Sequence, residues 1–300
     1  MRADRDYYGT PMEKSVKKIV VVGAGTMGSG IALTAAQSGI HAVQVDLAQS
    51  QLEKARGYHT KQLGRLVEKQ KISADDAKSV AARIVYSTDF SSARDADCVV
   101  EAASENPEVK KKLFKSFVET FDAETILATN TSSISITDIA TVTGSRATHV
   151  IGMHFFNPVP VMKLVEVIRG LATSDETVAR SLDLARAMGK TPVPANDRAG
   201  FVSNRVLMPL INEAFFAWME GVARPEDIDQ IMMLGCNFPM GPLRLADFIG
   251  LDVCHDIMMV LYRELGDAKF FPCPKLRQLM TAGRLGDKSG CGVFDYPAKA

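Results

Sequence analysis

The stretch that decides the fold is KKIVVVGAGTMGSGIALTAAQSG, residues 17–39. Its apolar run, residues 19–22, is continuous, which is typical of a parallel strand covered on both faces. Gly23, Gly25 and Gly28 follow with the spacing G-x-G-x-x-G, and a helix then extends to about Gly39. In this pattern the first glycine permits a tight turn, the second lets a pyrophosphate approach the backbone, and the third lets the helix pack close to the strand.

This turn indicates a dinucleotide site. Thr26 and Met27 stand where the helix begins, and the N–H groups and positive dipole end of a helix N-terminus attract phosphate. The following strand, HAVQVD, ends at Asp46, 18 residues after Gly28. A carboxylate at this place accepts hydrogen bonds from the adenosine ribose and repels a 2′-phosphate. We therefore expect NAD as the cofactor, held by the three glycines, Thr26, Met27 and Asp46; the alternative is that Asp46 only caps a helix or a loop.

Strand and helix patterns alternate from residue 17 to about residue 198. Such alternation predicts an α/β fold with a doubly wound, Rossmann-like parallel sheet, whose ligands bind at the carboxyl ends of the strands. Four polar side chains fall just after strands and should face one crevice there: Glu105, Asn130, Ser132 and His154.

Beyond residue 198 the pattern is helical alone, with segments at 201–221, 225–235, 245–266 and 274–286. We expect an NAD-binding domain over 17–198, an all-α domain over 199–300, and a flexible extension over 1–16. Methionine and aromatic side chains at helical spacing should form the core of the helical domain: Met208, Phe215, Phe216, Met232, Met233, Met258 and Met259. So much apolar surface can also carry a subunit interface, and we expect a homodimer built on this domain.

Residues 49–82 exceed what a crossover between neighbouring parallel strands needs, which is about a dozen residues or somewhat more. The long polar pattern from residue 49 and a new start after Ser73 predict a helical hairpin that projects from the sheet. This hairpin carries six basic side chains: Lys54, Arg56, Lys61, Arg65, Lys69 and Lys71. From the residues alone these are a solvated face, the usual explanation of such charge, or a grip on an anionic ligand.

The composition excludes several classes of protein. Lys+Arg and Asp+Glu both number 35, so the chain lacks the basic excess of a general nucleic-acid or membrane-surface binder. No apolar run approaches the roughly 20 residues of a membrane span. The five cysteines contain no CxxC pair, so we expect neither a disulfide framework nor a zinc or other metal site, and we expect a reducing compartment, the cytoplasm.

A second stretch, HFFNPVPVMKLVEV at residues 154–167, contains two unusual residues. Glu166 stands in an apolar strand, where an unpaired carboxylate costs roughly several kcal/mol. His154 ends the preceding strand, where the nicotinamide end of a dinucleotide is expected. If the chain turns back through Asn157, Pro158 and Pro160, Glu166 can hold one ring nitrogen of His154, and the other nitrogen can take a proton from a substrate hydroxyl. An isolated structural histidine is the alternative.

Seven segments resemble the L-3-hydroxyacyl-CoA dehydrogenase family, in order, over about residues 17–296: VVGAGTMGSGIA, EAASENPEVKKKLF, TNTSSISIT, HFFNPVPVMKLVEVIRG, AGFVSNRVLMPLINEA, GPLRLADFIGLD and LGDKSGCGVFDY. Within the family the chain is most similar to the bacterial 3-hydroxybutyryl-CoA dehydrogenases. The resemblance implies reversible, NAD-dependent oxidation of a short (S)-3-hydroxyacyl-CoA, such as 3-hydroxybutyryl-CoA, to the 3-ketoacyl-CoA, in fatty-acid or butanoate metabolism.

The resemblance also implies roles for single residues. His154 is the catalytic base and Glu166 its partner. Asn204 helps to hold the substrate's reacting oxygen and the histidine, while Ser132 contacts the substrate and the nicotinamide. Further positions line the dinucleotide site: Glu105, Lys110, Asn157 and Lys288. The hairpin holds coenzyme A of the acyl-CoA substrate, with Lys69 as a contact and Gln62 where the family often has a serine.

Two other functions stay open at this point. Relatives with similar histidine and glycine motifs oxidise sugar acids such as gulonate, although the basic hairpin favours coenzyme A. A dehydrogenase-like protein can also serve only as a binding or structural component, which the intact set of expected catalytic residues argues against: His154, Glu166, Ser132 and Asn204.

Overall fold

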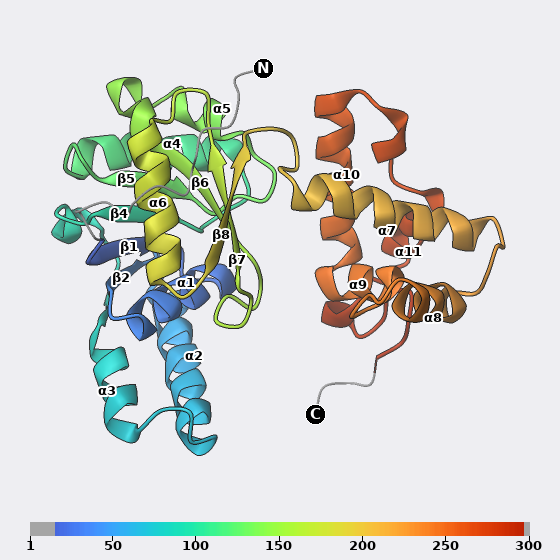
Figure 1. The fold of residues 1–300 in the computed structure, drawn as a ribbon, viewed down its shortest axis with the longest axis horizontal. Helices are drawn as coiled ribbons and strands as arrows, with labels where there is room; N and C mark the ends of the chain where they lie inside the picture. Colours follow the sequence, from blue (N-terminus) through green and yellow to red (C-terminus); the bar gives the residue numbers. More distant parts are fainter. Residues whose placement is uncertain (1–15, 297–300) are drawn as a thin grey trace. The chain divides into compact units, whose positions relative to one another are not determined.

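The computed structural model describes residues 16–296, and Figure 1 shows its ribbon. The extension expected over residues 1–16 lies outside this range except for Val16, which packs against the core of the sheet. The chain divides into two compact units between Asp197 and Arg198. The first unit alternates strands and helices, and the second is built of helices.

One eight-stranded sheet lies at the centre of the first unit, in the order β3-β2-β1-β4-β5-β6-β7-β8 (Figure 1). Its strands are β1 (Lys18–Val22), β2 (His41–Val45), β3 (Ile84–Ser87), β4 (Cys98–Glu101), β5 (Ile126–Thr129), β6 (Val150–Phe155), β7 (Leu164–Arg169) and β8 (Thr191–Asn196). All neighbours pair in parallel except β6 and β7, which are antiparallel. The expected doubly wound α/β fold is confirmed, with a sheet that is mainly parallel.

Helices cover the sheet and so bury its central strands on both faces. Six α-helices belong to this described unit: α1 (Thr26–Gln37), α2 (Gln49–Glu68), α3 (Ala74–Ala82), α4 (Pro107–Thr120), α5 (Ile136–Ala140) and α6 (Asp175–Ala187). Two short 3-10 helices, η1 (Ser91–Ala93) and η2 (Gly144–His149), complete it. The start of α4 follows directly from the sequence, because the Asn106 side chain accepts hydrogen bonds from the N–H groups of Glu108 and Val109, and Pro107 fills the first helical position.

The hairpin expected over residues 49–82 is confirmed as α2 and α3, which extend away from the sheet in Figure 1. Ser73 caps α3 in a reciprocal capping box with Asp76. Buried His59 anchors the base, because its Nε2 donates to the Ser29 carbonyl at 2.8 Å and its Nδ1 accepts from the Tyr86 hydroxyl at 2.7 Å. Burial lowers the pKa of His59, and the Ser29 carbonyl opposes this effect.

The second unit is helical, as the sequence predicts. It contains α7 (Ser203–Met219), α8 (Pro225–Gly235), α9 (Pro242–Ile249), α10 (Leu251–Leu265) and α11 (Pro274–Thr281), with two 3-10 helices, η3 (Ala268–Phe270) and η4 (Asp287–Ser289). Met208, Phe215 and Met258 are buried in its core. Leu243 and Leu261 join α9 and α10 to the same core, which makes this unit a separate apolar cluster.

Two expectations about the helical unit are wrong. The segment 245–266 is not one helix, because the backbone turns at Gly250, whose φ of 107° suits only glycine, and separates α9 from α10. Met233, expected in the core, is 41% exposed. It lies on α8, where Ile231 and Leu234 are also exposed, so this part of the helix presents apolar side chains outward.

The tight approach of α1 to β1 generates a stability prediction. A Cβ added at Gly28 would lie 1.9 Å from the Gly23 carbonyl oxygen, so Gly28→Ala forces the helix away from the turn. We expect a loss of about 1–3 kcal/mol in the free energy of unfolding, measured by urea denaturation. The matched control is Gly57→Ala in α2, where nothing lies within 4 Å and alanine favours the helix by up to about 1 kcal/mol. Equal stabilities of the two variants would contradict this packing.

Candidate active site

The strand order sets the place of the site. β1 lies between β2 and β4, so the chain leaves β1 toward one side of the sheet for β2 and β3 and later returns to the other side. Ligands of doubly wound sheets bind where the order reverses in this way, at the carboxyl ends of the strands. The glycine turn follows β1 there, and Glu105, Asn130 and Ser132 follow β4 and β5 at the same edge.

The glycine turn has the shape that a dinucleotide needs. Gly23, with φ of 109°, lies so close to the chain after β4 that a Cβ would approach the Ala102 carbonyl oxygen to 2.4 Å. Around Gly25, in contrast, nothing lies within 4 Å of an added Cβ, so a diphosphate can approach the backbone. Gly25 is also the N-cap of α1 and has no side-chain cap, and Thr26 and Met27 form the first turn. The residues present therefore fit a dinucleotide phosphate.

Asp46 is fixed against this turn by two backbone groups. Its Oδ2 accepts a hydrogen bond from the N–H of Ala24 at 2.9 Å, and its Oδ1 accepts one from the N–H of Ala48 at 3.0 Å. The carboxylate thus organises the loop, as the structural alternative proposed. The same two bonds hold its negative charge beside the glycine turn at the end of β2, where the adenosine ribose of a dinucleotide is expected.

His154 and Glu166 face each other across the antiparallel pair of β6 and β7, where they are register partners. Nδ1 of His154 lies 2.8 Å from Oε2 of Glu166, and their exposed fractions are only 6% and 3%. Because a carboxylate accepts hydrogen bonds and cannot donate them, Nδ1 carries the proton in this contact. The predicted partnership of the two side chains is confirmed, and it explains how a carboxylate is tolerated inside an apolar strand.

Two polar contacts hold the strand end and the loop around His154. The Asn130 side chain accepts a hydrogen bond from the N–H of Phe155 at 2.8 Å, which ties the end of β5 to β6. Buried Lys190 donates to the carbonyls of Val159 and Met162 in the loop between β6 and β7. Burial lowers the pKa of Lys190, and the two carbonyls replace the hydrogen bonds to water that its ammonium loses on burial.

Asn157, which the sequence predicts at the dinucleotide site, is an exposed residue of this loop.

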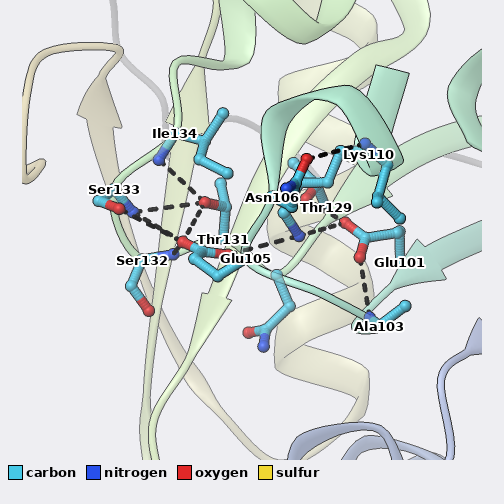
Figure 2. Close-up of polar contacts among 12 residues, drawn as sticks. Glu101, Ala103, Glu105, Asn106, Lys110, Thr129, Thr131, Ser132, Ser133 and Ile134 are labelled. Carbon is cyan, nitrogen blue, oxygen red and sulfur yellow. Dashed lines mark hydrogen bonds and ion pairs between the residues drawn. The ribbon is translucent and has the colours of Figure 1, made fainter. Parts of the chain in front are cut away.

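Glu105 organises the turn that carries Ser132. Its Oε1 accepts hydrogen bonds from the Thr131 hydroxyl at 2.6 Å and from the N–H groups of Ser132 and Ser133 at 2.8 and 3.2 Å (Figure 2). The sequence places Glu105 and Ser132 in one crevice, and the structure brings them into direct contact. One carboxylate oxygen is therefore engaged with the protein itself, a bond that the sequence does not reveal.

Lys110 lies deeper than its expected role suggests. Its side chain is 1% exposed, with Nζ 2.5 Å from Oε2 of Glu101 and 3.5 Å from Oε2 of Glu105. Glu101, at the end of β4, is fully buried and escapes the sequence analysis. Glu101 could have been predicted in the same way as Glu166, because it is also a carboxylate in an apolar strand, in the segment CVVEAA.

The remaining predicted site residues lie on the hairpin and in the second unit. Lys69 is the exposed C-cap of α2, and Gln62 is half-buried on the same helix. Asn204 lies in the first turn of α7. Lys288 belongs to η4 and forms an ion pair with Asp252.

Comparisons with known proteins give the family. Residues 18–198 match the model of the 3-hydroxyacyl-CoA dehydrogenase NAD binding domain, and residues 200–296 match that of the 3-hydroxyacyl-CoA dehydrogenase C-terminal domain. The chain belongs to the 3-hydroxyacyl-CoA dehydrogenase family. Its cofactor is NAD, and it is an oxidoreductase of that family.

Relatives match over nearly the whole chain. A probable 3-hydroxybutyryl-CoA dehydrogenase of Bacillus subtilis is 55% identical over 95% of this chain and 99% of its own length. A 3-hydroxybutyryl-CoA dehydrogenase of Clostridioides difficile is 45% identical over 93% and 99%. The crystal structure of (S)-3-hydroxybutyryl-CoA dehydrogenase from Ralstonia eutropha superposes with a TM-score of 0.91 at 48% identity, covering 94% of this chain and all of that one.

Residues 16–296 contain neither a membrane-spanning helix nor a cluster of metal-binding side chains. No helix in this range is long and apolar enough to cross a membrane. No three or more His, Cys, Asp or Glu side chains of the described chain form a group that could hold a metal ion.

The fixed charge of Asp46 predicts the choice between NAD and NADP. Because this carboxylate repels a 2′-phosphate, wild type should have a higher kcat/KM with NADH than with NADPH. In Asp46→Ala the ratio of the two kcat/KM values should fall by about tenfold or more. The matched control is Asp122→Ala, which removes an exposed carboxylate just before β5, at the opposite edge of the sheet. Steady-state kinetics with both cofactors measure the effect. Equal efficiency of wild type with NADH and NADPH would contradict the assignment.

Proposed function

We propose that the protein catalyses the reversible oxidation of a short-chain (S)-3-hydroxyacyl-CoA, such as 3-hydroxybutyryl-CoA, to the 3-ketoacyl-CoA with NAD. The observation that carries this proposal is the buried His154–Glu166 pair in the same sheet as the glycine turn. The names of the relatives, which act on 3-hydroxybutyryl-CoA, support the substrate. Fatty-acid or butanoate metabolism is the setting that such a substrate implies.

In the proposed mechanism His154 acts as the base through Nε2. Because Nδ1–H donates to Glu166, Nε2 is the nitrogen that takes the proton of the C3 hydroxyl, and the Glu166 carboxylate stabilises the imidazolium that results. NAD+, which the glycine turn and Asp46 would hold, would supply the hydride acceptor, so that the hydrogen on C3 would leave with its electron pair and C3 would become a carbonyl. In the reverse direction the imidazolium returns the proton to the oxygen.

The other residues of the site position the reactants in this proposal. By the family resemblance, Ser132, on the turn held by Glu105, would contact the substrate oxygen and the nicotinamide, and Asn204 would contact the same oxygen. The glycine turn and Asp46 would hold the dinucleotide. Its further contacts are those that the resemblance implies: Glu105, Lys110, Asn157 and Lys288. Such positioning converts binding energy into rate, because a reactant misplaced by about 1 Å reacts about 10²-fold more slowly.

Substitutions at the buried pair test the function directly. His154→Ala should lower kcat for acetoacetyl-CoA reduction by about 10²- to 10⁴-fold, the usual contribution of a general acid or base, while NADH binding is retained. Glu166→Gln should lower it less, because the amide keeps the size and an acceptor oxygen but not the charge. His149→Ala, at the other end of β6, is the control and should keep wild-type kcat. A His154→Ala variant with more than about a tenth of wild-type activity would show that the base lies elsewhere.

We further propose that the hairpin binds the coenzyme A part of the substrate. All six of its basic side chains are exposed, and Lys69 and Gln62 are seven residues apart, so they lie on one side of α2 two turns apart. Coenzyme A carries several phosphate charges, which such a surface attracts.

Lys69→Glu tests this binding surface. It should raise the KM for acetoacetyl-CoA several-fold at low salt, leave the KM for NADH within about twofold, and lose its effect at high salt, because exposed charge contacts are screened. Lys115→Glu, the same charge change on an exposed position of α4, should leave both constants unchanged. An unaltered KM for the thioester would make the hairpin charges a solvated face.

A homodimer through the C-terminal domain is also proposed. Large apolar side chains of that domain are exposed, among them Val206 at 68%, Val222 at 73%, Ile231 at 61% and Leu234 at 77%. Ile231 and Leu234 are three residues apart on α8 and so lie on one side of that helix, and adjoining exposed apolar residues usually mark an interface. Sedimentation equilibrium should give twice the 32.6 kDa of the chain, and a monomer at micromolar concentration would contradict the proposal.

All five cysteines are free, which supports a cytoplasmic location.

A further inference from the structure

Glu101 and Lys110 form a buried ion pair whose place in the site calls for an explanation. Their side chains are 0% and 1% exposed, and Nζ to Oε2 is 2.5 Å. Moving two charges out of water costs much of what their attraction returns, so a buried pair seldom stabilises a protein more than apolar residues of the same volume. The pair lies at the end of β4, the edge of the sheet that carries the site, and not in the middle of the core.

Every oxygen of Glu101 is used. Oε1 accepts a hydrogen bond from the N–H of Ala103 at 2.8 Å, and Oε2 accepts one from the Thr129 hydroxyl at 2.7 Å in addition to the one from Lys110. These bonds fasten together the segment after β4, the end of β5 and helix α4 (Figure 2). The carboxylate is therefore fixed from three directions, and it fixes the Lys110 ammonium in turn.

The next link is Glu105, whose two oxygens face opposite ways. Oε2 lies 3.5 Å from the Lys110 ammonium, and Oε1 accepts from Thr131, Ser132 and Ser133 in the turn after β5 (Figure 2). The Glu105 side chain is 43% exposed, so its own burial does not hold it in place. Instead, Glu105 is held by the Lys110 ammonium on one side and by the turn after β5 on the other.

The distances show which carboxylate holds the ammonium. Lys110 lies 1.0 Å closer to Glu101 than to Glu105, since 3.5 − 2.5 = 1.0 Å. If the charge of Glu101 is removed, Glu105 becomes the nearest carboxylate to a buried cation, and the attraction between them rises steeply as they approach. Glu105 is then drawn toward Lys110 and away from the N–H groups of Ser132 and Ser133.

We infer that Glu101 is a positioning residue: by holding Lys110, it keeps the Glu105 carboxylate on the turn that carries Ser132. Ser132 in turn is set for its contact with the substrate oxygen and the nicotinamide, a step that rests on the proposed function. Glu101 does not touch the reactants. It acts through three successive side-chain contacts, and its effect on the reaction is limited to what Ser132 contributes.

A readout that does not depend on the reaction is amide hydrogen exchange, resolved by NMR. In Glu101→Gln the Ser132 amide should exchange about tenfold faster or more, because it loses the Glu105 acceptor, while core amides of β1 stay unchanged. The Ser133 amide should also exchange faster, although it keeps the Thr131 hydroxyl as a second acceptor at 3.3 Å. Thr129→Val is the matched control: it removes one hydrogen bond of the same carboxylate but leaves its charge and Lys110 in place. Unchanged exchange at both serines in Glu101→Gln would overturn the inference.

The reaction readout is a double-mutant cycle with acetoacetyl-CoA and NADH. Glu101→Gln should lower kcat about tenfold, Ser132→Ala about 10²-fold, and the double variant no further than Ser132→Ala, because both changes act at the same hydroxyl. Losses that multiply would show that Glu101 acts independently of Ser132 and would overturn the inference. A wild-type protein that does not reduce acetoacetyl-CoA would contradict the proposed function and leave the exchange experiment as the test of the positioning.

If Glu101→Gln does not fold, Glu101→Asp carries the same test. It keeps the buried charge but draws the carboxylate back by one methylene, so it holds Lys110 less closely and Glu105 competes better for the ammonium. The same faster exchange at Ser132 and Ser133, and the same absence of any further loss of kcat on top of Ser132→Ala, are expected. Multiplied losses or unchanged exchange in this variant would overturn the inference as well.

Discussion

A hydrogen bond of 2.8 Å between Nδ1 of His154 and Oε2 of Glu166 is the contact on which the rest of the site depends. It exists because β7 returns antiparallel to β6, the one change of direction between neighbouring strands of this sheet. A parallel partner would have needed a long crossover and could not follow after the short segment that separates the two residues. The reversal therefore places His154 and Glu166 together, in the same sheet as the glycine turn.

Both buried carboxylates of the sheet, Glu101 and Glu166, are paired with a nitrogen base, Lys110 and His154. In each case the strand is apolar around the acid, so the partner is a physical requirement of burial. The two pairs then serve different ends. In the proposed mechanism the His154–Glu166 pair presents a ring nitrogen to the substrate, whereas the inferred role of the Glu101–Lys110 pair is to hold a neighbouring turn. At this edge of the sheet, buried charged pairs thus fix the positions of side chains and turns.

The sequence predicts those parts of the site that depend on local spacing. The glycine turn and Asp46 lie close together in the chain, and the proline-rich turn limits where the strand of Glu166 can go. Lys110 shows the limit of such reasoning, because its position on α4 is predictable but its burial depends on Glu101 and on the packing of separate elements. The break at Gly250 was missed for a similar reason, since an apolar pattern continues across it.

The most direct test of the central claim is the protonation state of the His154 ring, measured by nitrogen NMR on protein with isotope-labelled histidine. The signal can be assigned by its loss in His154→Gln. At neutral pH the account predicts a proton on Nδ1, which donates to Glu166, and the chemical shift of an unprotonated nitrogen at Nε2. A neutral ring with its proton on Nε2 would contradict the account, because Glu166 would then not orient the base.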